Sequence, residues 1–73
     1  MVFDSIQEII ASKLDIAPEE ITLESSFVDM QVDSLYMVEI MLAIEEEFSI
    51  MIDEAAGMEN VGDLVQYVEK KIK

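Results

Sequence analysis

The sequence predicts an all-α fold with three longer helices, one short helix and a long loop between the first two helices. Apolar residues recur at spacings of three and four in three segments of the chain, which is the spacing of one helix face. Between the first two segments, residues 15–33 contain isolated apolar residues without a sustained period. With 73 residues, 52% of them hydrophobic, the chain has room for one small domain, and we expect it to span residues 1–73.

The first helix is predicted over residues 2–14 and ends near Asp15. Its apolar residues fall on one face at helical spacing: Val2, Ile6, Ile9, Ile10 and Leu14. Asp4 and Ser5 each fit a capping box with the residue three positions later, yet apolar residues before them extend the same face. The sequence therefore leaves the start of this helix open.

The loop over residues 15–33 is long for a structureless connection inside a compact domain. We therefore expect its apolar residues Ile16, Ile21 and Phe27 to pack onto the core. A short turn of helix is predicted where Pro18 precedes two glutamates, because proline favours the first position of a helix.

The second helix is predicted from about Ser34 to Phe48, with Asp33 as its N-cap. An aspartate carboxylate can accept the backbone N–H groups that the first turn of a helix leaves unpaired. This arrangement would place Ser34 in the first turn, exposed to solvent.

Two apolar faces are predicted on this second helix. The wider face is expected to meet the core and consists of Met37, Ile40, Met41, Ile44 and Phe48. The other lies roughly 100–150° away around the helix and forms what we term the docking patch: Leu35, Val38 and Leu42. Three carboxylates border it: Glu39, Glu45 and Glu46. Acidic side chains usually only solvate the outer face of a helix, but an exposed apolar patch rimmed by them suggests docking to another protein.

Two further helices are predicted after a short apolar link over residues 50–52. Asp53 is expected to cap a brief helix over residues 54–56 that ends at Gly57. Asn60 is expected to cap the last helix. The apolar face of that helix consists of Val61, Leu64, Val65, Val68 and Ile72.

The charge of the chain bears on the partners it can have. The chain has 17 acidic and 4 basic residues, and its net charge of −13 argues against nucleic acid or an anionic membrane and favours a basic protein surface. No apolar run approaches the ~20 residues of a membrane span. No basic and apolar signal segment opens the chain, so we expect a cytoplasmic protein.

The residue types that are missing bear on catalysis. The chain has no histidine, arginine, cysteine or tryptophan. The usual general base and the thiolate nucleophile are therefore absent, and we do not expect an enzyme. No stretch has the spaced acids, central glycine and closing glutamate of a calcium loop, so no metal site is predicted.

The segment Asp33-Ser34-Leu35 resembles the motif of the acyl carrier protein family, an Asp-Ser-Leu at the head of the second helix. The match extends through Phe27-Val28-Asp29, Val38-Glu39, residues 43–48 and residues 61–69, and so covers nearly the whole chain. It departs from the family at Gln31-Val32, where a glycine is usual, and at Tyr36-Met37, which replace a common Asp-Thr pair.

The resemblance implies a four-helix bundle that carries covalent 4′-phosphopantetheine on Ser34, with Asp33 as motif residue and helix cap. Ser34 would then be the substrate of a transferase that uses coenzyme A and magnesium. Acyl intermediates would be carried as thioesters in fatty acid biosynthesis. The implied partners of this monomeric carrier are phosphopantetheinyl transferase and fatty acid synthesis enzymes with basic docking patches.

The resemblance also assigns roles to the two faces of the second helix. The expected partner-binding residues are Leu35, Val38, Glu39, Leu42, Glu45 and Glu46. The expected acyl-chain pocket consists of Met37, Met41, Ile44 and Phe48, whose flexible thioethers and apolar groups would otherwise only fill the core.

Other functions stay open on the sequence alone. The chain could carry intermediates of polyketide, peptide or other specialised acyl pathways. It could also be a non-covalent acidic adaptor that docks through the second helix without a prosthetic group. Ser34 itself could be only part of a helix cap, or a phosphorylation site.

Overall fold

The computed structural model describes residues 1–52 and 58–72 of the chain. These residues form α1 (Val2–Leu14), the 3₁₀ helix η1 (Pro18–Glu20), α2 (Ser34–Phe48) and α3 (Val61–Ile72). They contain no strand, which confirms the all-α prediction. The brief helix predicted over residues 54–56 lies outside the described residues, so the four-helix bundle stays a prediction.

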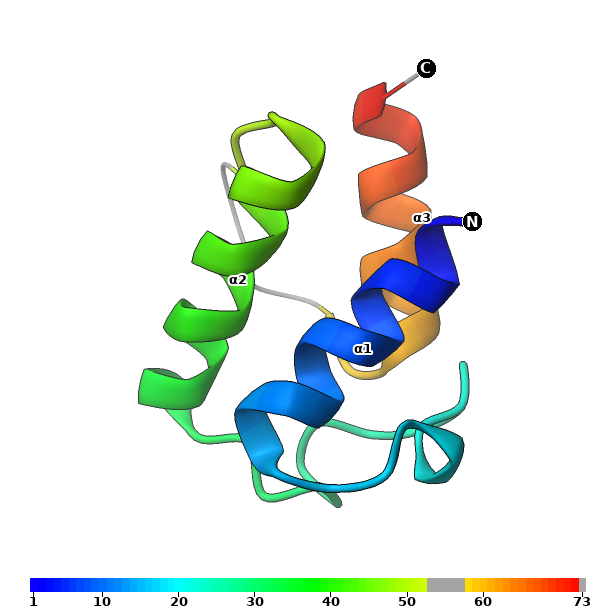
Figure 1. Cartoon of the computed structure of the whole chain (residues 1–73), viewed down its shortest axis with the longest axis vertical. Coiled ribbons are helices and arrows are strands. Elements are labelled where there is room, and N and C mark those ends of the chain that lie inside the picture. The colour runs from blue at the N-terminus through cyan, green and yellow to red at the C-terminus, as the bar shows by residue number, and fades with distance from the viewer. Residues whose placement is uncertain (53–57, 73) are drawn as a thin grey trace.

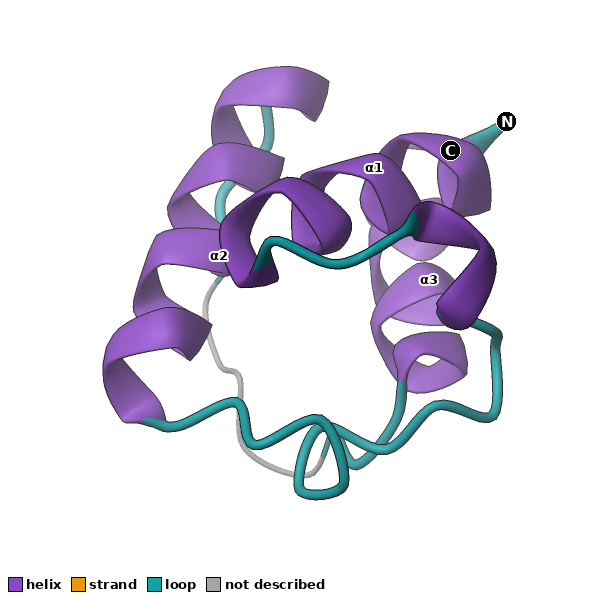
Figure 2. Ribbon diagram, turned by 60° about the horizontal axis from the view of Figure 1, so that its bottom comes forward, coloured by secondary structure: helices purple, strands orange, loops and turns teal. Residues whose placement is uncertain are grey.

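The three long helices surround one core. α1 packs against both α2 and α3, and Figure 1 shows it crossing in front of the lower half of α3 towards the lower end of α2. The segment between α1 and α2 runs along one end of the molecule, as Figure 2 shows. Within residues 1–52 and 58–72, every helix is too short or too polar to span a lipid bilayer.

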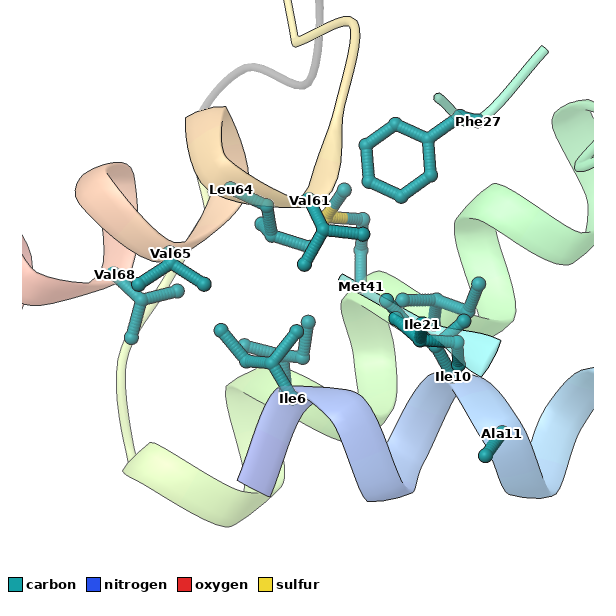
Figure 3. Close-up of a cluster of buried hydrophobic side chains, with 12 residues drawn as sticks. Ile6, Ile10, Ala11, Ile21, Phe27, Met41, Val61, Leu64, Val65 and Val68 are labelled. Atoms are coloured by element: carbon teal, nitrogen blue, oxygen red, sulfur yellow. The ribbon is translucent and has the colours of Figure 1, made fainter. Parts of the chain in front are cut away.

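The core draws on all three helices and on the long loop, as Figure 3 shows for the labelled side chains from α1, α3 and Phe27. Its buried residues are Ile6, Ile10, Ala11, Ile21, Phe27, Ile40, Met41, Ile44, Val61, Leu64, Val65 and Val68. Because each large apolar side chain contributes about 1.5–3 kcal/mol when fully buried, this cluster is the main source of stability in a chain without disulfides.

Most helix boundaries agree with the sequence prediction. α2 has the predicted bounds, and α1 ends at Leu14, followed by its C-cap Asp15, whose φ of 58° stops the helix near the predicted position. α1 starts after Met1, which makes no side-chain cap bond, so neither candidate capping box is used. Ile72 was expected on the core face of α3 but is 46% exposed. It lies in the last turn of α3, which rises past the start of α1 in Figure 1.

The long loop is pinned as predicted by its apolar residues, with Ile21 and Phe27 buried and Ile16 partly buried. It is also joined to the start of α3 by backbone hydrogen bonds. Phe27 N–H donates to the Glu59 carbonyl, and Gly62 N–H donates to the Leu23 carbonyl at 2.8 Å. A Cβ at Gly62 would lie 3.1 Å from that carbonyl oxygen, which explains the small residue there.

Gln7 holds the other end of the loop. Its side-chain Nε2 donates to the carbonyls of Pro18 and Ile21 at 2.7 and 2.9 Å. One amide group thus fixes both ends of a short segment that begins with η1 and ends at the buried Ile21.

We predict that Gln7→Glu lowers the free energy of unfolding by about 1–3 kcal/mol, because a carboxylate cannot donate and would face two carbonyl oxygens. Urea unfolding followed by circular dichroism measures this change. Gln66→Glu is the matched control, since Gln66 is exposed on α3 and the same change there should alter stability by no more than about 0.5 kcal/mol. Equal effects of the two variants would show that added charge, and not the lost bonds, is responsible.

Candidate functional site

The start of α2 is fixed by Asp33. This residue has extended backbone angles, φ −84° and ψ −176°, and its Oδ1 accepts a hydrogen bond from Tyr36 N–H at 2.9 Å. Its carbonyl also accepts the Met37 N–H at 2.9 Å. The predicted N-cap is confirmed, and it sets where the first turn of α2 lies.

Ser34 is the first residue of α2 and is exposed to solvent. Because Asp33 holds the helix start on one side and the helix continues on the other, the Ser34 hydroxyl projects from a well-defined backbone. No acidic residue lies in the first turn of α2, so the partial positive charge of the helix N-terminus is opposed only by the cap itself. Because Ser34 is exposed, a partner protein can reach its hydroxyl from solvent.

The docking patch is exposed as predicted. Leu35, Val38 and Leu42 are 67%, 54% and 55% exposed. These three large apolar side chains lie on one helix face within about two turns, and residues 1–52 and 58–72 leave them exposed.

The three carboxylates around the docking patch differ in their surroundings. Glu46 is exposed. Glu39 is partly buried and lies 3.9 Å from the Lys13 ammonium of α1, a weak ion pair at the surface. Glu45 is partly buried as well, and its Oε2 accepts a hydrogen bond from Ile52 N–H at 2.7 Å. The rim is thus not a uniform ring of free charges.

The opposite face of α2 meets the core. Met41 and Ile44 are buried, and Met37 and Phe48 are partly buried and packed against the core cluster. The structure therefore brings together the four side chains that the sequence assigned to an acyl-chain pocket, on the side of α2 away from the docking patch.

The structure shows the surroundings of Gln31 and Tyr36, which belong to the two departures from the family motif. Gln31 has φ 60°, a left-handed conformation that glycine adopts at lower cost, so the chain turns there at the expense of roughly 1 kcal/mol of strain. Tyr36 lines a hollow of about 450 Å³ between the end of α1 and the start of α2. The other residues that line the hollow are Leu14, Ile16, Glu20, Met30 and Gln31.

Two positioning contacts were not predicted from the sequence. The bonds of Gln7 to the loop were missed because the sequence suggested only a capping box with Asp4 for this residue. Its spacing from Phe3 and Ile10 places it beside the apolar face, and that is the signal that could have revealed it. The bond from Ile52 to Glu45 joins segments on either side of a helix end and has no local sequence signal.

Acidic side chains are abundant, yet no group of three or more His, Cys, Asp or Glu residues in the described part of the chain is arranged to hold a metal ion.

We expect Asp33→Ala to lower the free energy of unfolding by about 0.5–2 kcal/mol, because the bond to Tyr36 N–H is lost. Asp33→Asn should retain stability within about 0.5 kcal/mol, since an asparagine oxygen caps a helix as well. Thermal and urea unfolding of the two variants provide the measurement. Equal losses of stability in the two variants would show that the charge of Asp33 stabilises the protein, and not its hydrogen bond to Tyr36 N–H.

Comparison with known proteins identifies the family. The model of the phosphopantetheine attachment site matches residues 4–68. The acyl carrier protein of Streptococcus pyogenes serotype M1 is 46% identical over 72 residues, which are 99% of this chain and 97% of the relative. The acyl carrier protein of Streptococcus thermophilus is 43% identical over the same share of each chain. That of Lactococcus lactis subsp. cremoris is 46% identical over 68 residues, 93% of each chain. The chain therefore belongs to the acyl carrier protein family, which has a phosphopantetheine attachment site and whose members are carriers and not enzymes.

Proposed function

We propose that this chain carries acyl intermediates of fatty acid biosynthesis on a 4′-phosphopantetheine group attached to Ser34. The observation that carries the proposal is the placement of Ser34, exposed as the first residue of a helix whose start Asp33 caps. When bound, the group supplies a terminal thiol that holds acyl groups as thioesters. The chain has no cysteine, so it has no thiol of its own for this purpose.

The residues present fit the prosthetic group. Its attachment needs a hydroxyl that an external transferase can reach, and the exposed Ser34 offers one. The group is joined through a phosphate, and the N-terminus of a helix is a favourable place for a phosphate because its free N–H groups carry partial positive charge. Ser34 lies at that end of α2. Asp33 would keep the helix start, and hence the attachment point, in one position.

The docking patch, together with Glu39 and Glu46, is proposed as the surface that basic partner enzymes recognise. These partners would be the phosphopantetheinyl transferase and enzymes of fatty acid synthesis. Carboxylates around an apolar patch raise encounter rates with basic surfaces and favour the correct orientation. The net charge of −13 adds to this attraction and also disfavours self-association, which supports a monomeric carrier.

The position of the acidic residues supports a role beyond stability. Glu45, Glu46 and Glu47 lie in the last turn of α2, where there is no basic residue. Carboxylates near the negative end of a helix are unfavourable by about 0.3–1 kcal/mol each at the surface. Glu46 and Glu47 are exposed there, and in an already acidic chain their position is better explained by partner recognition than by folding.

We further propose that Met37, Met41, Ile44 and Phe48 yield to an acyl chain inside the domain. These side chains already pack against the core, and methionine adapts to changes of cavity shape more readily than branched residues do. Amide hydrogen exchange in α2 should therefore change when the thiol carries a long acyl chain. Identical exchange with and without the chain would contradict the proposed pocket.

The experiment that tests the proposed function has two steps. The purified chain is incubated with coenzyme A, magnesium and a phosphopantetheinyl transferase, and its intact mass is measured. The loaded protein then replaces the carrier in a reconstituted bacterial fatty acid synthesis system, and the masses of its acylated forms are followed. We expect a gain of one phosphopantetheine group and then successive two-carbon extensions.

Each step has a result that would contradict one part of the proposal. No mass gain in the first step would support the non-covalent adaptor. Loading without extension would support a carrier of polyketide, peptide or other specialised acyl groups. That alternative stays in view because the names of the relatives do not specify a pathway.

A further inference from the structure

Glu45 organises the chain immediately after α2. Its backbone carbonyl accepts hydrogen bonds from the N–H groups of Ser49 and Ile50, the second at 3.2 Å. Its side-chain Oε2 accepts a third bond, from Ile52 N–H at 2.7 Å. Three amides of a four-residue segment thus converge on one residue of the helix that precedes it.

These bonds set the path of residues 49–52, which we term the α2 link. Ser49 has φ 56° and turns the chain back at the end of the helix. Ile50 and Ile52 are partly buried against the core, and Met51 between them is 76% exposed. The Ile52 N–H is part-buried where it meets Glu45. A distance of 2.7 Å is at the short end for an N–H bond to an ionised acceptor, as expected of a strong, charge-assisted bond.

The carboxylate of Glu46 makes no hydrogen bond to residues 49–52. Glu46 is exposed at the next position of the same helix. Glu39, about two turns earlier in α2, is near Lys13. A lysine or arginine of a partner protein that paired with Glu45 would have to compete with the Ile52 amide, whereas the same cation could meet Glu46 without displacing a bond to the α2 link.

We propose that Glu45 is a positioning residue: its carboxylate holds the α2 link against the core, and the docking charge at this end of the helix is supplied by Glu46. The inference rests on the docking surface of the proposed function. Within its acidic rim, Glu45 binds the chain itself, whereas Glu46 faces the partner protein. Glu45 thereby fixes where the exposed Met51 and the partly buried Ile50 and Ile52 lie.

Three variants separate these roles: Glu45→Ala, Glu45→Gln and Glu46→Gln. Glutamine keeps an oxygen that can accept the Ile52 N–H but removes the charge, so it should restore the bond that alanine loses. Amide hydrogen exchange at Ile52, measured by NMR, reports the bond directly. We expect it to become about tenfold faster or more in Glu45→Ala and to stay within about threefold of the parent chain in Glu45→Gln and Glu46→Gln.

The KM of the transferase for each carrier variant provides the second readout. Glu46→Gln is expected to raise the KM several-fold, because the lost carboxylate faces the partner. Glu45→Gln should leave it within about twofold of the parent value, since that charge is engaged inside the carrier.

Unchanged exchange at Ile52 in Glu45→Ala would overturn the proposed role in the α2 link. A KM in Glu45→Gln as high as that in Glu46→Gln would overturn it as well, by making Glu45 a docking residue. If the parent chain is not loaded at all, the proposed function fails, and the exchange measurement by itself decides the role of Glu45.

Discussion

Ser34→Ala is expected to abolish loading by phosphopantetheinyl transferase. Phosphopantetheine transfer requires an oxygen that forms the new phosphoester bond, and in this chain the exposed hydroxyl at the capped start of α2 is the proposed donor. The variant should show no mass gain after incubation with coenzyme A, magnesium and transferase under conditions in which the parent chain is fully loaded. Because alanine is a good helix former and Ser34 is exposed, stability should change by no more than about 0.5 kcal/mol.

Ser12→Ala is the matched control for this experiment. Ser12 is exposed on α1, so the substitution is the same and also lies on a helix surface. It should load as fast as the parent chain. Circular dichroism of both variants establishes that the fold is retained. A full mass gain in Ser34→Ala would place the attachment site elsewhere, whereas loss of loading in both variants would point to a general defect of folding or docking.

Leu64→Ala is expected to lower the free energy of unfolding more than any of the other proposed substitutions. Leu64 is fully buried between the helices, and replacing a buried leucine by alanine typically costs 2–5 kcal/mol through lost contacts and the cavity that remains. Domains are stable by only about 5–15 kcal/mol in total, and a small one is expected near the lower end of that range. The melting temperature should therefore fall by at least about 8 °C.

Leu42→Ala is the control for Leu64→Ala. It removes the same side chain from an exposed position, so it shows how much of the lost stability is due to burial. Leu42 belongs to the docking patch and is 55% exposed, so the same change there should cost no more than about 0.5 kcal/mol. It should instead raise the KM of the transferase. A large loss of stability in Leu42→Ala would contradict the assignment of this residue to an exposed surface, and a small loss in Leu64→Ala would contradict the described core.

The parts of the fold that could be predicted are those that local sequence determines. The bounds of α2 follow from a capping residue and a sustained helical period, and both signals lie within the segment itself. The exposure of the docking patch follows from the same period. Asn60 was likewise predicted as a cap, and its Oδ1 accepts the Asp63 N–H at 2.9 Å.

The parts that could not be predicted depend on contacts between distant segments. Gln7 reaches loop carbonyls that are 11 and 14 residues away, and the loop is joined to residues 59–62 by backbone bonds. Backbone bonds carry no side-chain signal, so no residue pattern indicated them. Glu45 was assigned to the acidic rim from its angular position on α2 alone. That position does not indicate that residues 49–52 turn back and bind its carboxylate.

The attachment site can be located directly on the parent chain. After loading by the transferase, the protein is fragmented in a mass spectrometer, and the fragments that retain the added group are identified. We predict that every such fragment contains Ser34 and that the group resides on this residue alone. A group on any other serine, threonine or tyrosine, or no added group at all, would show that Ser34 is not the attachment site.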